Sequence, residues 1–121
     1  MNEIKFENKD GVAVIAIKGN FWSQDSGEDL VGKFKSLAED YIHSCEERKI
    51  PPKIIVDMKE VTVTNATGLG VLVNALSKAR RLQGDVILVN LYHKKVNTLF
   101  EITQLSKVFT VASSMEEALK K

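Results

Sequence analysis

Residues 54–72 of the chain read IIVDMKEVTVTNATGLGVL. The apolar residues 54–56 predict a short buried strand, a short loop is expected after it, and a helix is expected to begin at NATG, from Asn65 onward. Asn65 is the predicted N-cap, because its side-chain oxygen can accept a hydrogen bond from a free backbone N–H. The first N–H groups of a helix lack helical partners and carry partial positive charge. The junction is therefore a place where a chemical switch can act.

The residues near the N-terminus predict a hairpin. Residues 4–6 and 12–17 have the apolar patterns of strands, and the pair Asp10-Gly11 between them is a strong turn signal. The second run is nearly continuous in apolar residues, which favours a central strand that is buried on both faces. Gly19 is expected to end this strand.

A long amphipathic helix is predicted between the hairpin and the central stretch. Ser26 precedes it, Asp29 follows three residues later as a capping-box-like acid, and the pair Pro51-Pro52 stops it. Apolar residues recur at helical spacing and predict a stripe that faces the core. The stripe comprises Leu30, Val31, Phe34, Leu37, Ala38, Tyr41, Ile42 and Cys45.

The helix that begins near Ala66 is expected to run to about Gln83, with Gly84 as its C-terminal cap. Residues 86–89 predict the next buried strand, and residues 108–111 predict a last short strand. The predicted buried positions of the helix are Leu69, Leu72, Val73 and Leu76.

Two more helices complete the predicted elements. Residues 94–103 predict a third helix that buries Val96, Leu99 and Phe100. Ser113 with Glu116 predicts the capped start of a closing helix.

Strands and helices thus alternate, and the strands are apolar throughout. This pattern is typical of a mostly parallel sheet with crossover helices, to which the first hairpin adds an antiparallel pair. We therefore expect a single α/β domain over residues 1–121, with a mixed, mostly parallel sheet and about four helices. The strands at 54–56 and 86–89 should be adjacent, parallel and interior, because a helix connects them.

The composition narrows the classes of function. The formal net charge of +1 gives no global field that would favour nucleic acid or an anionic membrane, and no apolar run approaches the length of a membrane span. The N-terminal residues lack the basic and apolar regions of a signal peptide. The single cysteine, Cys45, leaves no internal disulfide and no cysteine-cluster zinc site. We expect a soluble, cytoplasmic domain without a cofactor or metal, and without a nucleic-acid partner or membrane insertion.

The central motif, NATGLG over residues 65–70, resembles the signature of the STAS domain, the family of the bacterial anti-sigma-factor antagonists. The resemblance extends to the segment GDVILV at 84–89, to VNTLFEIT at 96–103 and to SMEEAL at 114–119, in the family's order and spacing. It implies a non-enzymatic binding module that takes part in partner switching. The implied partner is an anti-sigma factor or a serine kinase of the GHKL type.

The resemblance also assigns a regulatory role to this helix start. The family motif is typically Asp-Ser-Ser/Thr-Gly-Leu-Gly, and its first hydroxyl residue is phosphorylated by the anti-sigma kinase. In this chain Asn65 stands in the Asp place and Ala66 in the acceptor place, so the usual phosphorylation cannot occur. The implied partner-binding and regulatory residues are Thr64, Asn65, Ala66, Thr67, Gly68 and Leu69, with the loop at 20–26 beside them.

Two alternatives remain open at this stage. Thr67 either replaces the missing phosphate acceptor or only hydrogen-bonds the helix start. A shift of one residue turns a helical side chain by about 100°, so a kinase whose active site is aligned for residue 66 would be poorly aligned for Thr67. The chain is also compatible with a STAS scaffold or subunit of a transporter or sensory assembly that phosphorylation does not regulate.

Other residues with chemical potential have simpler explanations. His43 and His93 show no metal-ligand spacing, Asp57 is expected to stabilise a turn, and Trp22 is expected to pack in the core, with an interface role as the alternative. The motif at 68–70 lacks the third glycine of a dinucleotide-binding loop and the lysine of a P-loop. No catalytic arrangement with a recognisable local context is present.

Overall fold

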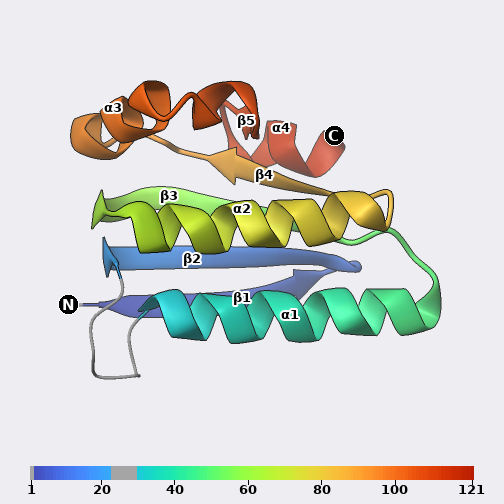
Figure 1. Ribbon diagram of the computed structural model, residues 1–121. Helices are drawn as coiled ribbons and strands as arrows, with labels where there is room; N and C mark the ends of the chain where they lie inside the picture. Colours follow the sequence, from blue (N-terminus) through green and yellow to red (C-terminus); the bar gives the residue numbers. More distant parts are fainter. Residues whose placement is uncertain (1, 23–29) are drawn as a thin grey trace.

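The computed structural model describes residues 2–22 and 30–121, which form a five-stranded sheet and its covering helices (Figure 1). In the sheet the strands lie in the order β1-β2-β3-β4-β5. The strands are β1 (Glu3–Lys9), β2 (Val12–Phe21), β3 (Lys53–Thr64), β4 (Asp85–Val89) and β5 (Thr110–Ala112). The helices are α1 (Leu30–Arg48), α2 (Ala66–Arg81), α3 (Lys94–Ile102), the short 3-10 helix η1 (Leu105–Lys107) and α4 (Met115–Lys120).

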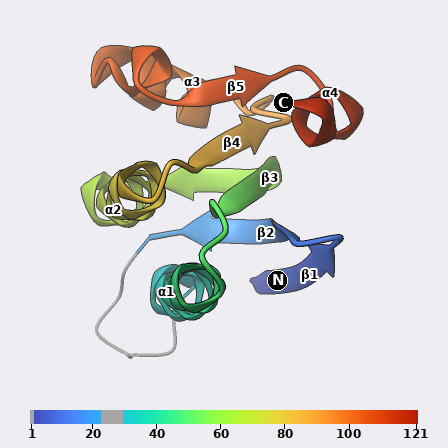
Figure 2. The same ribbon diagram turned by 90° about the vertical axis from the view of Figure 1, so that its right-hand side faces the viewer.

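The sheet is mixed, as the sequence predicts. Strands β1 and β2 pair antiparallel, and β2, β3, β4 and β5 pair parallel with their neighbours. Strands β3 and β4 are adjacent, parallel and interior, which confirms the prediction for residues 54–56 and 86–89. Each parallel connection carries a helix. Helices α1 and α2 cover one face of the sheet and α4 covers part of the other (Figure 2).

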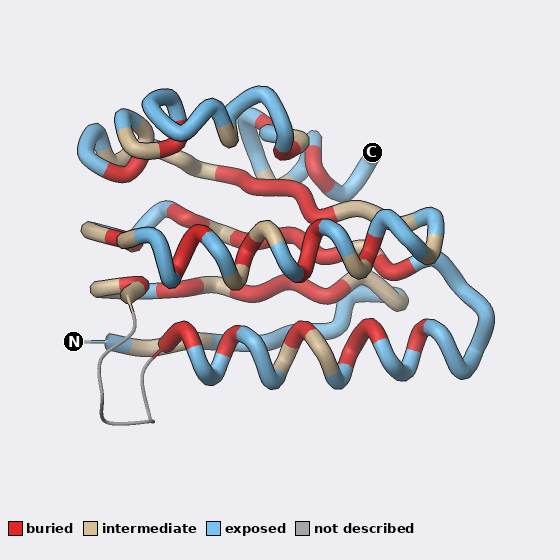
Figure 3. The backbone as a smooth tube through the Cα atoms, in the orientation of Figure 1, coloured by how far each residue is buried: buried red, intermediate tan, exposed pale blue. Residues whose placement is uncertain are grey.

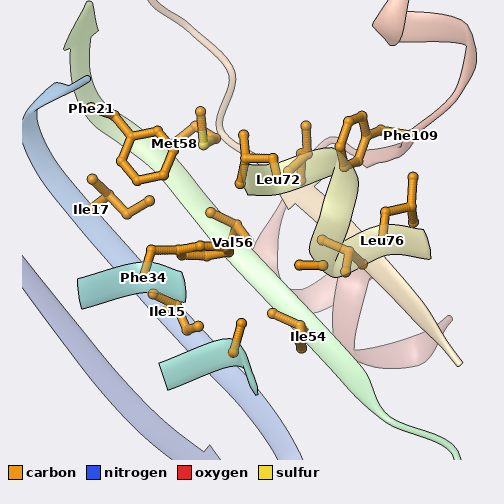
Figure 4. Packing of buried hydrophobic residues seen from close by; sticks show 14 of the residues in the cluster. Ile15, Ile17, Phe21, Phe34, Ile54, Val56, Met58, Leu72, Leu76 and Phe109 are labelled. Carbon is orange, nitrogen blue, oxygen red and sulfur yellow. The ribbon is translucent and has the colours of Figure 1, made fainter. Parts of the chain in front are cut away.

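The main core lies between the sheet and helices α1, α2 and α3, and Figure 3 shows the burial of the inner strands. Phe21 and Phe34 meet edge to face at a centroid distance of 5.6 Å and join β2 to α1. Met58, Val56 and Leu72 pack beside them (Figure 4). A smaller cluster on the opposite face lies under α4 and contains Val14, Ile55, Ile87, Val89, Ala112 and Ala118.

The predicted stripe of α1 is confirmed. Seven of its eight residues are buried, Cys45 among them, and Leu37 is half-buried against the core. On α2, Leu69, Leu72 and Leu76 are buried as predicted, while Val73 is half-buried. On α3, Val96 and Phe100 are buried and Leu99 is half-buried.

Strand β3 is longer than the sequence suggested: the residues predicted as a loop continue the strand to Thr64. The register with β2 shifts twice, between the partners of Ala16 and Lys18 and between those of Gly19 and Asn20. Each shift inserts one extra residue in β3 and bends the strand. The buried positions therefore pass from Val56 to Met58, Val61 and Thr64, and this broken alternation hides the strand in the sequence.

Several helix and strand ends also differ from their predicted positions. Gly19 does not end β2; it adopts a positive φ of 107° and the strand continues to Phe21. The last strand is shorter and begins at Thr110, and the N-cap of α4 is Ser114 in place of Ser113, with its hydroxyl accepting from the Glu117 N–H. The capping residues predicted for α1, Ser26 and Asp29, lie outside the described residues.

The end of α2 corrects the role of Gly84. Gln83 is the left-handed residue, with φ of 69°, and the Gly84 N–H donates to the Ala79 carbonyl at 2.8 Å. Gly84 is needed for another reason: a Cβ there would lie 1.9 Å from the Pro52 carbonyl oxygen. Glycine thus allows the end of α2 to approach the segment that leads into β3.

Candidate functional site: the start of helix α2

Asn65 caps helix α2, as the sequence predicts. Its backbone is extended, with φ of −141°, and its side-chain oxygen accepts from the Gly68 N–H at 3.0 Å. Its own carbonyl accepts from the Leu69 N–H at 2.9 Å, which is the first bond of the helix. An amide therefore performs the capping that an aspartate could also perform, without placing a charge at the helix start.

The helix start is tied to the ends of two strands. Phe21 and Thr64 are partners in the β2–β3 ladder, and the Thr64 hydroxyl donates to the Phe21 carbonyl at 2.7 Å. A Cβ at Gly68 would lie 2.4 Å from both this carbonyl oxygen and the Thr64 hydroxyl oxygen. The first turn of α2 therefore packs directly on the backbone of β2, and only glycine fits at residue 68.

Burial divides the predicted site residues into two groups. Thr64, Gly68 and Leu69 are buried, with Thr64 only 7% exposed, so they support the helix start from inside. Ala66 and Thr67 are exposed and Asn65 is half-buried. Gly70, one turn along the helix, is exposed as well, and a Cβ there would meet no atom within 4 Å.

Because Gly68 belongs to the buried group, a Gly68→Glu variant would not test the exposed surface alone. The side chain of such a variant would collide with the Phe21 carbonyl oxygen, which belongs to the backbone, and with the Thr64 hydroxyl. The expected result is a displaced helix start. Gly70 is the position where bulk and charge can be added to the exposed surface without that collision.

Polar contacts extend the site along the ends of β2 and β3. The Thr62 hydroxyl donates to the Asn20 side-chain oxygen at 3.1 Å, and the Asn20 N–H donates to the Asn2 side chain at 3.1 Å. Trp22 lies directly after the end of β2 and is half-buried, and its indole N–H has no hydrogen-bond acceptor among the residues that the structure describes. Of the predicted loop at 20–26, residues 23–26 lie outside the described part.

Asp57 lies inside β3, where the pairing with β4 ends, and not at the turn that the sequence suggested. Its carboxylate accepts from the Lys59 N–H at 3.0 Å and from the Asn90 side-chain amide at 3.1 Å. It therefore holds the first bulge of β3 and the segment after β4. A hollow of about 380 Å³ lies beside it, lined by Glu3, Lys5, Ala16, Ile17, Lys18, Asp57, Lys59 and Glu60.

The described residues give no sign of a metal or membrane site. No group of three or more His, Cys, Asp or Glu side chains in 2–22 and 30–121 is arranged to hold a metal ion. Within the same ranges, every helix is too short or too polar to cross a bilayer. His43 is exposed and lies 2.7 Å from Glu47 on the same helix, and His93 occupies the N-cap position of α3.

An ion pair connects α2 to α1. The Lys78 ammonium lies 2.6 Å from the Glu39 carboxylate, and this hydrogen bond holds the pKa of Glu39 below its usual value. Both side chains are partly exposed, so the contribution of the pair to stability is small. The orientation of α2 comes from its buried apolar residues, which pack against the sheet and α1.

A mixed sheet with helices α1 to α3 on one face, together with the NATGLG helix start, defines a small α/β domain. The sequence pattern of the STAS domain matches residues 3–118, so the chain belongs to the STAS domain family. A 56-residue segment is 38% identical to the anti-sigma-B factor antagonist of Listeria monocytogenes. That segment covers 46% of this chain and 48% of the relative, so the match spans about half the length of the curated relative.

Solved structures show the same fold at low sequence identity. The crystal structure of a candidate anti-sigma factor antagonist from Thermotoga maritima superposes with a TM-score of 0.78 at 19% identity, over 97% of this chain and 92% of the other. The phosphorylated form of SpoIIAA, a cell fate determinant of Bacillus, gives 0.70 at 17% identity, over 98% and 97% of the two chains. These likenesses establish the fold.

Proposed function

We propose that this chain is a non-enzymatic binding module of the anti-sigma-factor antagonist type, which docks an anti-sigma factor or a GHKL-type serine kinase through the start of α2. The observation that carries the proposal is the exposed turn formed by Ala66, Thr67 and Gly70 on a buried, tightly tied base. A fixed base holds the turn in one geometry, so the turn itself loses little conformational freedom when a partner docks. The Listeria monocytogenes relative and the Thermotoga maritima structure, whose names give them as anti-sigma factor antagonists, support this class.

Ala66 makes the proposed binding state permanent. Phosphate on a hydroxyl at this position would put a charge of about −2 on the docking surface, and that charge would have to lose water when the partner binds. Ala66 has no hydroxyl to accept it. The chain then behaves as the unphosphorylated form at all times and keeps its partner unless another signal intervenes.

The docking surface is tested with a pair of charge substitutions on one side of α2. Gly70→Glu should lower the affinity for the kinase at least about tenfold, because an unpaired carboxylate would be buried in the interface. Ser77→Glu is the matched control: Ser77 is exposed on the same side of α2, two turns farther along, and should leave the affinity nearly unchanged.

Isothermal titration calorimetry measures both affinities, and circular dichroism verifies that both variants are folded. Equal affinities for Gly70→Glu and the wild type would move the interface away from the helix start. Capture of a transporter or sensory assembly, with no kinase, from the native cell would favour the scaffold alternative.

The locked state is tested by restoring the family motif. The double variant Asn65→Asp, Ala66→Ser should gain stoichiometric phosphate from the cognate kinase and ATP, and should then release the kinase. Wild type and Thr67→Val should remain unlabelled in the same reaction, which mass spectrometry reads directly. Labelling of the wild type that Thr67→Val removes would mean that the acceptor has moved by one residue and that the chain is not locked.

A further inference from the structure

Strand β1 forms one edge of the sheet and pairs only with β2 among the described strands (Figure 2). An edge strand presents backbone N–H and C=O groups that a further strand can pair with. We propose that two copies of this chain associate by antiparallel pairing of β1 with β1 of the second copy. The product is a symmetric dimer in which one sheet continues through both copies. The inference does not rest on the proposed function.

The order of charges along β1 matches this partner. On the face of the sheet away from α1, the strand carries Glu3, Lys5, Glu7 and Lys9 in strict alternation of sign. The pairing fixes the face, because Glu7 lies opposite Val14, which belongs to the cluster under α4. A second copy running antiparallel reads the same series in reverse. The strand is therefore complementary in charge to itself.

The charges select one register. A two-fold axis at Phe6 places Glu3 opposite Lys9 and Lys5 opposite Glu7 of the second copy, so every charged pair is attractive. The neighbouring registers that keep the faces aligned place Glu3 opposite Glu7, or Lys5 opposite Lys9, and like charges directly opposite each other oppose pairing. The alternation thus favours a single symmetric arrangement.

The backbone is oriented for the same register. Asp10 and Gly11 have φ of 54° and 90°, which is typical of the two-residue turn that closes a hairpin on a hydrogen-bonded pair. Because that pair is Lys9 with Val12, alternate residues of β1 direct their backbone groups to the free edge, and Phe6 is one of them. With the two-fold axis at Phe6, the Phe6 residues of the two copies lie opposite each other, and both direct their backbone N–H and C=O groups to the shared edge. The charged residues fall at the alternate pairs, where opposing Cα atoms approach most closely.

Phe6 gives the pairing an apolar centre. Its side chain lies on the α1 face and meets the Tyr41 ring at a centroid distance of 6.5 Å, yet it remains 40% exposed. In the dimer it lies directly opposite its symmetry mate, and an aromatic cross-strand pair of this kind is favourable. Lysines on an edge strand often prevent pairing. Here each lysine meets a glutamate of the second copy.

The test uses charge reversal with rescue. Sedimentation equilibrium of the wild type should show a concentration-dependent equilibrium between monomer and dimer. Lys5→Glu and Glu7→Lys should each weaken the dimer about tenfold, because each converts two attractive pairs into repulsive ones. An equimolar mixture of the two variants should associate as strongly as the wild type, since all opposing charges are again opposite in sign. The double variant Lys5→Glu, Glu7→Lys should also recover.

Glu101→Lys on the exposed surface of α3 is the matched control and should leave dimerisation unchanged. Thermal melts verify that every variant is folded. A wild type that stays monomeric at millimolar concentration would overturn the proposal. A dimer that the single reversals do not weaken, or that the mixture does not restore, would show that the copies meet through another surface.

Discussion

At the scale of single residues, Gly68 and Gly70 lie in the first two turns of α2 and allow the same substitution to be compared at a packed and at an open position. Gly68→Ala should lower the free energy of unfolding by about 1–3 kcal/mol, since its Cβ would meet the backbone of β2. Gly70→Ala has open space around the new methyl group and should raise the free energy of unfolding by about 0.5–1 kcal/mol, because alanine favours helix. Urea denaturation of the two variants measures both changes. Equal effects would show that the contact with Phe21 is not maintained in solution.

The residues of the site differ in how far the sequence predicts them. The capping role of Asn65 depends only on the residues that follow it, and it was predicted correctly. The burial of Thr64 and Gly68 depends on the Phe21 carbonyl, which belongs to a strand more than forty residues away in the chain. A local pattern carries no information about that contact. For this reason the sequence indicates the helix start but not which of its residues are exposed.

At the scale of elements, helix α2 is held by its buried leucines. Leu72 is fully buried and Leu76 nearly so, in the cluster between α2 and the sheet (Figure 4). Leu72→Ala and Leu76→Ala should each lower the free energy of unfolding by about 2–5 kcal/mol, the sum of lost apolar burial and the remaining cavity. Ser77→Ala, at an exposed position of the same helix, is the control. Denaturation curves in which the leucine variants lose less than about 1 kcal/mol would contradict the described packing.

The elements that the sequence predicted well are those with unbroken periodicity. Helix α1 repeats its apolar residues at regular helical spacing, and β4 is a continuous apolar run, so both were assigned correctly. The sequence predicts too short a strand for β3, because its bulges replace the spacing of two residues between buried positions by a spacing of three. The sequence predicts that β2 ends at Gly19 because glycine often ends a strand, but β2 continues through Gly19 and accommodates its positive φ.

At the scale of the whole molecule, Tyr41 joins three segments. Its hydroxyl donates to the Gly11 carbonyl at 2.6 Å and accepts from the Lys53 N–H at 3.1 Å, so α1 is tied to the hairpin turn and to the start of β3. Burial raises the pKa of Tyr41 from 10.0 to about 12. A raised pKa in the folded state means that the neutral phenol contributes fully below pH 10 and that its contribution is lost as the pH rises toward 12.

The free energy of unfolding of the wild type should therefore fall by about 2–3 kcal/mol from this group as the pH rises from about 10 to 12. Tyr41→Phe should be less stable than the wild type at pH 7, because the Lys53 N–H loses its acceptor, and should show a weaker decline in the alkaline range. Tyr92→Phe, at a tyrosine that is 66% exposed, should follow the wild type throughout. Parallel declines in all three proteins would assign the alkaline loss to other groups.

Residues 66 and 68 differ in the substitutions that they tolerate. Residue 68 admits nothing larger than hydrogen, whereas residue 66 faces outward from the first position of the helix. Exchange of alanine for serine there leaves the packing intact, so a lineage can gain or lose a hydroxyl at this position without first acquiring compensating mutations elsewhere. A single substitution can thus change the chemistry of the exposed residue 66, while the packed base of the helix start stays the same.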